Sequence, residues 1–334
     1  MLLTICIVTR NRVVLLKETI EAFYAQLTDD VELLVVDGAS SDKTPELMAG
    51  YIGDSRVRYV RLEENGGIDR DFDKAVRFSR GEYCWLFSDD DVVKQHAIER
   101  VLEAVRKDMD VVVVNAEVCD DLVQEVLIPS RVKASTDVNY PVEKFEEFFV
   151  AAADHLSFIG ALVIRKALWL ERNAEKYFGT YFVHVGVLFQ QPPVGTCLVI
   201  AEPLIRIRYG NASWSSKSFV IWNALWPTLI WSFANFRIEA REKVVLEKPY
   251  LSLFNLLKYR ALGVYGYAEY LQFVKPQQQK TVDMMVSWLV SVLPGLLLNA
   301  TILGVVRICF PGRRMALFEL RKSKYYWRNV HLRA

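Results

Sequence analysis

The sequence lacks the patterns that mark several common nucleotide-binding and metal-binding classes. No Gly-x-Gly-x-x-Gly follows the first apolar run and no Gly-rich loop ends in Lys-Ser or Lys-Thr, which argues against a Rossmann dinucleotide site and a P-loop. The five cysteines include no Cys-x-x-Cys pair, so we expect reduced core thiols of a cytosolic protein rather than a zinc site. The net charge of +1 gives no indication of a nucleic-acid partner. The opening run LLTICIVT follows no basic region and predicts a buried strand, not a signal peptide.

Short apolar runs alternate with amphipathic segments in the N-terminal third of the chain. Strand-like runs, rich in β-branched and aromatic residues, occupy 2–9, 31–37, 57–62, 82–88 and 110–115. Helical spacing of apolar residues occupies 13–27, 43–52, 69–80 and 94–107. This alternation predicts an α/β fold with a mostly parallel central sheet covered on both faces. Ligands of such sheets bind at the carboxyl ends of the strands, and the polar residues of this region cluster there. Further along, 157–170 predicts a strand leading into a helix, and 197–209 predicts one or two strands.

Three consecutive carboxylates, Asp89, Asp90 and Asp91, end the fourth strand-like run. Without a glycine-rich phosphate loop, a bound nucleotide would need its charge neutralised by a cation. Mg²⁺ and Mn²⁺ take one or two carboxylates and complete their coordination with water and phosphate oxygens. We therefore expect a metal site here. The structural alternative is an N-cap for the following helix, although one Asp would suffice for that.

Asp37 closes the second predicted strand and is followed by Gly38. A carboxylate at this position is able to accept hydrogen bonds from a ribose hydroxyl or a base N–H. The alternative is that Asp37 caps the local turn together with Ser40 and Ser41. We expect a binding role.

Several motifs together resemble a known family. ICIVTRNR, VELLVVDGASSDKT and ENGGIDRDFDKAVRFSRGEYCWLFSDDD, in this order and spacing, are similar to the nucleotide-sugar-binding half of family 2 glycosyltransferases with the GT-A fold. GGIDRDF, GEYCWLFSDDD, YFGTYFVH and AEPLIRIRYGN resemble more narrowly the abequosyltransferase-like branch that builds bacterial O-antigens. The resemblance implies a GT-A catalytic domain at 1–211, with a nucleotide-sugar-binding half at 1–115 and an acceptor half at 116–211. Residues 212–334 would form a helical C-terminal region.

The resemblance also implies roles for individual residues. Asp89 and Asp91 would hold Mg²⁺ or Mn²⁺, and Ser88 stands where the family usually has Asp, so the metal motif is shifted or depends on Asp91. The residues implied in nucleotide-sugar binding are Thr9, Asn11, Asp37, Asp69, Arg70 and Asp90.

The general base is the least defined element of the implied mechanism. Inverting members of the family use an Asp or Glu in the C-terminal half of the catalytic domain, and His184 is the residue that aligns with it. Imidazole titrates near neutral pH and is able to act as a base. His184 would otherwise be a metal ligand or a structural core residue. Asp154 and His155 are the alternative candidates for the base.

The C-terminal region carries an uncharged segment, 284–306, followed by a basic tail, 307–334, with eight Lys or Arg and the single acid Glu319. The segment is long enough to cross a bilayer, but Pro294-Gly295 interrupts it, and a crossing would place the tail opposite the nucleotide site. We therefore expect two short helices lying in the cytoplasmic face of the inner membrane. A second uncharged segment, 219–236, places Trp222, Trp226 and Trp231 at headgroup level. A spanning helix and ordinary core helices are the alternatives.

These features together predict a metal-dependent, inverting hexosyl- or deoxyhexosyltransferase. Its donor would be a nucleotide sugar, and its acceptor an O-antigen-like saccharide on a polyprenyl diphosphate at the membrane surface. The alternatives are a catalytically inactive nucleotide-sugar-binding protein and a sugar nucleotidyltransferase. The sequence does not define the donor, the acceptor or the oligomeric state.

Overall fold

The computed structural model describes residues 1–211, 217–277 and 280–330. These residues form two compact units. The first unit contains Met1–Cys119, Pro129–Arg208 and Phe233–Ala240. The second contains Asp120–Ile128, Tyr209–Ser232 and the chain from Arg241 onward. The chain therefore passes from the first unit to the second near residue 209. The exceptions are Asp120–Ile128, which belongs to the second unit, and Phe233–Ala240, which belongs to the first.

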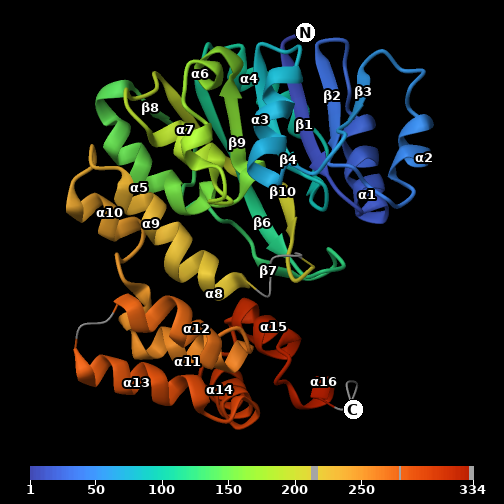
Figure 1. The fold of residues 1–334 in the computed structure, drawn as a ribbon. Helices are drawn as coiled ribbons and strands as arrows, with labels where there is room; N and C mark the ends of the chain where they lie inside the picture. Colours follow the sequence, from blue (N-terminus) through green and yellow to red (C-terminus); the bar gives the residue numbers. More distant parts are fainter. Residues whose placement is uncertain (212–216, 278–279, 331–334) are drawn as a thin grey trace. The chain divides into compact units, whose positions relative to one another are not determined.

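A large mixed sheet forms the centre of the first unit (Figure 1). Its strand order is β3-β2-β1-β4-β9-β6-β10-β5, with β8 paired to β10. Pairing is parallel among β1, β2, β3 and β4 and between β6 and β10, as the alternating pattern predicts, whereas β9 is antiparallel to both neighbours. The strands of the first unit are β1 (Leu3–Thr9), β2 (Val31–Asp37), β3 (Val57–Arg61), β4 (Tyr83–Ser88), β5 (Val92–Val93), β6 (Val111–Cys119), β8 (Val138–Tyr140), β9 (Leu162–Arg165) and β10 (Cys197–Arg208).

Helices cover both faces of this sheet, because the buried strands alternate their side chains between two apolar layers. Leu3 and Ile5 of β1 belong to the core cluster shared with α1, α2 and α4. Cys6 points to the opposite face, where its thiol lies 3.8 Å from the carbonyl of Ala75 in α3. The helices of the first unit are α1 (Val13–Tyr24), α2 (Thr44–Ala49), α3 (Ile68–Phe78), α4 (Ala97–Val105), α5 (Phe145–Leu156), α6 (Lys166–Leu170), α7 (Val183–Phe189) and α10 (Ile238–Val244), of which α10 continues into the second unit.

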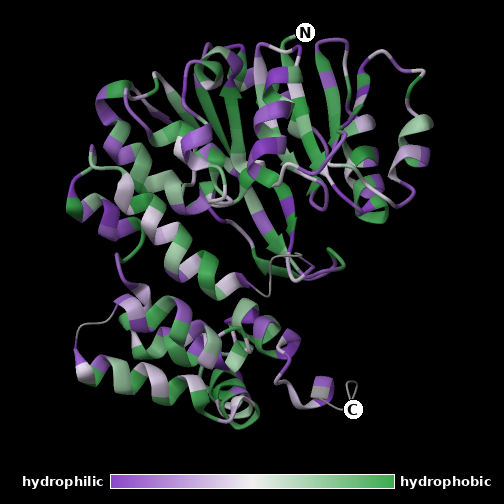
Figure 2. Cartoon of the chain, viewed as in Figure 1, coloured by the Kyte–Doolittle hydropathy of each residue, from purple (hydrophilic) through white to green (hydrophobic). Residues whose placement is uncertain are grey.

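The expected strand-to-helix transition at 157–170 is present as β9 and α6, and residues 197–209 form the single long strand β10. Residues 83–87 of β4 and 33–36 of β2 are continuous runs of buried hydrophobic residues, and the run in β2 appears green in Figure 2. Cys6, Cys84, Cys119 and Cys197 are buried, whereas Cys309 is exposed. The α/β fold with a helical C-terminal region is therefore confirmed.

The second unit is mainly helical. It contains β7 (Val126–Ile128), α8 (Ser218–Val220), a π-helical turn at Ile221–Leu225, α9 (Trp226–Ser232), α11 (Leu253–Leu262), α12 (Tyr267–Glu269), α13 (Thr281–Val292), α14 (Gly295–Cys309), α15 (Arg314–Lys322) and α16 (Trp327–Val330). Its core cluster includes Phe219, Tyr259 and Tyr265.

In the described part of the chain no single helix is long and apolar enough to cross a membrane. The helix pair α13 and α14 passes that test only when the two are taken together, and it is bent by 93° at the break between them. The break falls at Pro294-Gly295, as the sequence predicts. Trp226 is buried, which contradicts its expected place at headgroup level. His331 to Ala334, including Arg333 of the basic tail, lie outside the described residues.

Candidate active site

The carboxyl ends of β1, β2 and β4 meet at one edge of the sheet. The strand register pairs Thr9 with Asp37 and the neighbouring Val8 with Ser88. Thr9, Asp37 and the three carboxylates after Ser88 therefore lie along one edge, where an open α/β sheet binds its ligands. The N-cap alternative for these carboxylates is excluded, because the short strand β5 follows them and α4 begins only at Ala97.

The three carboxylates have different partners. Asp89 accepts a hydrogen bond of 2.7 Å from the Thr9 hydroxyl. The Arg12 guanidinium bridges two of the three, 2.6 Å from an Asp90 oxygen and 3.4 Å from an Asp89 oxygen. Asp91 accepts from the backbone N–H of Arg208 at 2.7 Å and from the Ser88 hydroxyl. Both oxygens of Asp91 are thus occupied by the protein, whereas the described residues occupy one oxygen of Asp90.

The electrostatics of this acidic tip favour an added positive charge. Burial raises the pKa of Asp89 to about 7, an effect that Arg12 opposes and the neighbouring Asp90 reinforces. Burial, followed by the charge of Asp90, also raises the pKa of Asp91 well above its ordinary value. Ionising the buried Asp89 and Asp91 beside Asp90 therefore costs free energy that a bound cation would offset.

The residues present fit a hard divalent cation that takes few protein ligands. No group of three or more His, Cys, Asp or Glu side chains suited to a metal occurs in the ranges that the structure describes. One or two carboxylates with water and substrate phosphates is the coordination typical of Mg²⁺, and it needs no such cage. Asp90, which has one oxygen without a contact among the described residues, is best placed to supply such a ligand. The metal roles predicted for Asp89 and Asp91 stay predictions.

Asp37 and Asn11 organise the loops at this edge. Asp37 is fully buried and accepts from the Ser40 N–H at 2.8 Å and the Tyr59 hydroxyl at 2.6 Å, so the turn-capping interaction weighed above is present. Asn11 has a φ of 55° and accepts from the N–H of Ser41 at 2.7 Å. These bonds join the loop after β1 to the loop after β2. Contact of Thr9, Asn11 and Asp37 with a nucleotide stays a prediction.

Asp71 lies beside the same loops and has no role in the sequence-based assignment. It is buried, its Oδ1 has no hydrogen-bond partner among the described residues, and burial raises its pKa. A Cβ added at Gly38 would lie 3.0 Å from one Asp71 oxygen, and one added at Gly66 would lie 2.7 Å from the other. These two glycines therefore leave room for the Asp71 carboxylate, which explains the Gly that follows Asp37.

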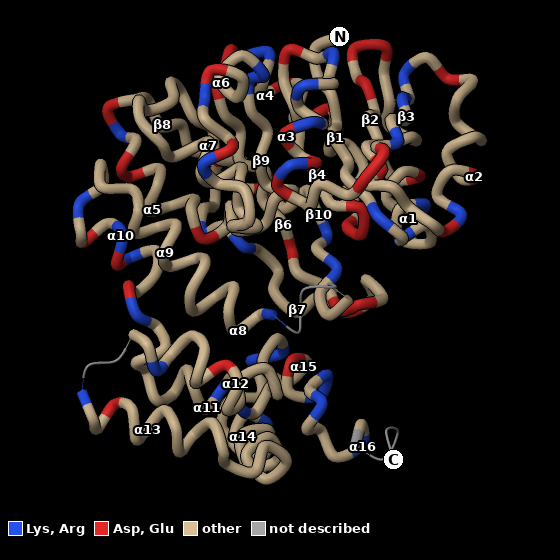
Figure 3. Tube along the Cα trace, viewed as in Figure 1, with Lys and Arg blue, Asp and Glu red and all other residues tan. Residues whose placement is uncertain are grey.

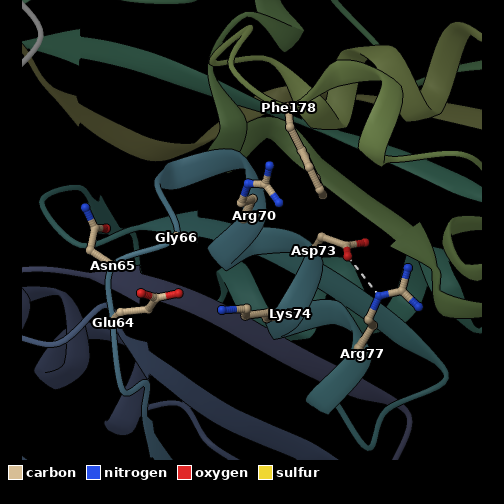
Figure 4. Close-up of a pocket in the computed structure, with 8 residues that line it drawn as sticks. All are labelled: Glu64, Asn65, Gly66, Arg70, Asp73, Lys74, Arg77 and Phe178. Carbon is tan, nitrogen blue, oxygen red and sulfur yellow. Dashed lines mark hydrogen bonds and ion pairs between the residues drawn. The ribbon is translucent and has the colours of Figure 1, made fainter.

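A pocket of about 510 Å³ lies next to these loops (Figure 4). Arg70, Lys74 and Arg77 line it from successive turns of α3, so three cations share one helix face. The Arg70 guanidinium stacks on the Phe178 ring at 4.8 Å. The other lining residues are Glu64, Asn65, Gly66 and Asp73. The predicted contact of Arg70 with a base or diphosphate is compatible with this position and stays a prediction.

Asp69 has a structural function that the sequence did not indicate. Its buried carboxylate accepts from the N–H groups of Gly179 at 2.8 Å, Tyr181 at 3.0 Å and Val183 at 3.1 Å. It thereby fixes α3 to the loop that leads into α7. Both Asp69 oxygens already accept hydrogen bonds from this loop. Contact of Asp69 with the nucleotide stays a prediction.

Replacing Asp69 should be costly. Asp69→Ala removes three charge-assisted hydrogen bonds and leaves the N–H groups of the loop without their acceptor, so we expect a loss of about 3 to 5 kcal/mol of unfolding free energy. Urea unfolding followed by tryptophan fluorescence measures it. Asp29→Ala, at an exposed position of the same unit, serves as the control and should change stability by less than about 0.5 kcal/mol. Equal stability of the two variants would contradict the anchoring function.

His184 lies inside the first unit. Its Nε2 donates to the Leu156 carbonyl at 2.7 Å, and burial lowers its pKa to about 4. His155, the neighbouring candidate, donates from Nε2 to the Val114 carbonyl at 2.8 Å, and burial lowers its pKa to about 3. These positions favour the structural alternative for both. Asp154 is exposed at the end of α5, with its carboxylate 3.4 Å from Arg131. The catalytic roles predicted for His184 and Asp154 stay predictions.

Arg12 and Arg208 are the residues that sequence reasoning missed. Arg208 ends β10 and donates from Nε to the Asp90 carbonyl at 2.9 Å, while its guanidinium pairs with Glu18. Both arginines lie in the motifs TRNR and RIRYGN, but the sequence gives no signal that either would meet the acidic tip.

Comparisons with known proteins agree with this geometry. The sequence profile of the family described as "Glycosyl transferase family 2" matches residues 4–169. The abequosyltransferase RfbV of Salmonella typhimurium is 28% identical over 233 residues, which cover 65% of this chain and 69% of RfbV.

Two solved structures share the fold. Staphylococcus aureus TarS 1-349 in complex with UDP-GlcNAc has a TM-score of 0.53 at 14% identity, covering 100% of this chain and 92% of that one. The mannosyltransferase PcManGT of Pyrobaculum calidifontis, in complex with GDP-Man and Mn²⁺, has a TM-score of 0.52 at 14% identity, covering 98% and 87%. Residues 4–169 therefore form a glycosyl transferase family 2 domain, and the protein is a glycosyltransferase with the GT-A fold.

Proposed function

We propose that this enzyme is a metal-dependent, inverting glycosyltransferase that moves a hexose or deoxyhexose from a nucleotide sugar. Its acceptor is an O-antigen-like saccharide carried on a polyprenyl diphosphate at the cytoplasmic face of the inner membrane. The observation that carries the proposal is the acidic tip formed by Asp89, Asp90 and Asp91 at the same sheet edge as Thr9 and Asp37. The likeness to an abequosyltransferase supports the O-antigen-like acceptor.

The donor is held by complementary charges. Asp90 and Asp89 hold the cation, which supplies Lewis-acid stabilisation of the departing diphosphate when it is bound. Arg70 and Lys74 provide positive charge in the pocket beside this edge, and Asp37 accepts hydrogen bonds from base or ribose. The neighbours solved with UDP-GlcNAc and with GDP-Man and Mn²⁺ support a nucleotide-sugar donor and a divalent cation.

The acceptor hydroxyl must lose a proton to a base within hydrogen-bonding reach. Asp154 suits this function better than His184, because it is exposed, whereas His184 is buried and donates to the end of α5. The imidazole of His184 thus acts as a positioning group that holds the helix on which Asp154 lies. Asp154→Asn should lower kcat and leave donor affinity unchanged.

Thermal melting of the purified protein with a panel of nucleotide sugars tests this function. We expect one nucleotide class to raise the melting temperature, by more with Mn²⁺ than with EDTA. Release of the nucleoside diphosphate then distinguishes an enzyme from an inactive binding protein. Stabilisation by a nucleoside triphosphate together with a sugar phosphate, and not by nucleotide sugars, would instead identify a nucleotidyltransferase.

A further inference from the structure

The helices α13 and α14 of the second unit have their apolar side chains on the outside. On α13, Val282, Met285, Leu289 and Val292 recur at intervals of three and four residues and are 45% to 69% exposed. On α14, Leu297 is 63% exposed and Ile308 is 80% exposed. We call these six side chains the α13–α14 face. Soluble monomeric proteins rarely leave clustered large apolar side chains this exposed unless the surface serves an interaction.

Three uncharged polar side chains of the same helices point inward. Ser287 and Ser291 of α13 are buried, as is Asn299 of α14. Asn299 donates to the carbonyls of Ala261 at 3.1 Å and Leu320 at 3.0 Å. A surface helix in water has the opposite pattern, with its apolar stripe toward the core. The two helices are therefore arranged for an apolar environment outside the protein.

Beyond the first turn of α13, which contains Asp283, the charge around this face is of one sign. Residues 284–318 contain no Asp or Glu, and their cations are Arg307, Arg313 and Arg314. Figure 3 shows α13 without charged residues after its first turn. The Arg313 guanidinium lies 5.0 Å from the ring of Phe310, which is itself 47% exposed. Exposed aromatic residues beside arginines are typical of the lipid headgroup region.

The lengths of the two helices define how they would meet a bilayer. At about 1.5 Å per residue, α13 and α14 are each shorter than the hydrocarbon core of roughly 30 Å, and with a 93° bend between them they do not form one straight span. We propose that the α13–α14 face docks on the surface of an anionic lipid bilayer, inserting its apolar side chains below headgroups that Arg307, Arg313 and Arg314 contact.

A second copy of this chain is a less suitable occupant. Two such faces in contact would bring the cationic clusters of both copies together without an intervening acid from residues 284–318. An anionic membrane would bury the apolar side chains in its acyl region and pair the arginines with its negatively charged headgroups. This docking extends the proposed function, because it brings the enzyme to the surface that carries a lipid-linked acceptor.

Vesicle flotation of the full chain tests the proposal without donor or acceptor, so its result is independent of the glycosyltransferase assignment. Phosphatidylcholine vesicles with and without phosphatidylglycerol are compared. We expect the wild-type protein to bind the anionic vesicles and Leu289→Glu/Ile308→Glu to lose that binding. The control Val14→Glu/Ile52→Glu should retain it, since these two positions of the first unit are each 70% exposed and lie outside the α13–α14 face. Neutralising all three arginines to alanine should weaken binding on the order of 100-fold.

Two further measurements complete the test. Brominated lipid should quench the fluorescence of Trp288, which is 46% exposed on α13, in the wild type, and Trp288→Phe should remove that part of the quenching. Sedimentation velocity without lipid measures self-association. The proposal would be overturned if the wild-type protein did not float with anionic vesicles. It would also be overturned if the wild type formed a dimer that Leu289→Glu/Ile308→Glu dissociates while neither protein binds vesicles.

Discussion

Asp90→Asn is expected to slow sugar transfer by about 10²- to 10³-fold, because it removes a negative charge that the proposed cation needs at the diphosphate. Its effect on stability should be small, since the described contact that it weakens is the pair with Arg12, at 2.6 Å. Initial rates with saturating and subsaturating Mn²⁺ measure the loss. Raising the Mn²⁺ concentration should partly restore the rate if Asp90 is a metal ligand.

Asp29→Asn is the matched control for this experiment, because Asp29 is an exposed carboxylate of the same unit, far along the chain from the acidic tip. It should leave both the rate and the Mn²⁺ dependence unchanged. An Asp90→Asn enzyme with wild-type turnover at low Mn²⁺ would refute the assignment of this carboxylate to the cation.

The second large effect is an acid-dependent loss of stability through His184. Its pKa is lowered to about 4 in the folded protein, against about 6.5 in the unfolded chain. Below pH 6.5 the unfolded state therefore binds a proton that the folded state does not, and the unfolding free energy falls until about pH 4. At about 1.4 kcal/mol per pKa unit, the loss is roughly 3 kcal/mol.

The variant His184→Gln isolates this contribution, because Gln keeps an N–H donor for the Leu156 carbonyl and does not titrate. The difference in unfolding free energy between wild type and variant should change by roughly 3 kcal/mol from pH 6.5 to pH 4 and stay constant above pH 7. Comparing the two proteins cancels the opposite contribution of Asp89, whose raised pKa favours the folded state at low pH. Parallel pH profiles would show that His184 titrates normally. At neutral pH, loss of transfer in this variant would restore His184 as a candidate base.

The local elements of the first unit were predictable from sequence because their apolar periodicity is local. The runs at 31–37 and 82–88 became β2 and β4, and the acidic tip lies at the strand end where it was expected. Strand β9 was recognised as a strand, but its antiparallel insertion between β4 and β6 depends on pairings more than 50 residues apart, as between Val111 and Ile164. Such pairings leave no pattern in one sequence.

The partners of the site residues were less predictable than the residues themselves. Asp91 meets the N–H of Arg208 from a strand that ends 117 positions further along. Burial was also difficult to infer, since His184 stands in an apolar run that is compatible with either a cleft wall or a core helix. The burial of His184 and the hydrogen bond from its Nε2 to the Leu156 carbonyl are visible only in the coordinates.

The segment Phe233–Ala240 belongs to the first unit, although it follows the start of the second unit in the chain. A truncated enzyme therefore needs to keep it. The Phe236 ring stacks on Phe149 with centroids 4.0 Å apart, and Phe233 packs edge-on against Phe189. A recombinant fragment that stops at residue 211 would lack Phe233 and Phe236, would expose Phe149 and Phe189, and should aggregate on expression. The smallest catalytic fragment worth producing therefore extends at least to Ala240, and a protease-resistant core should retain this stretch.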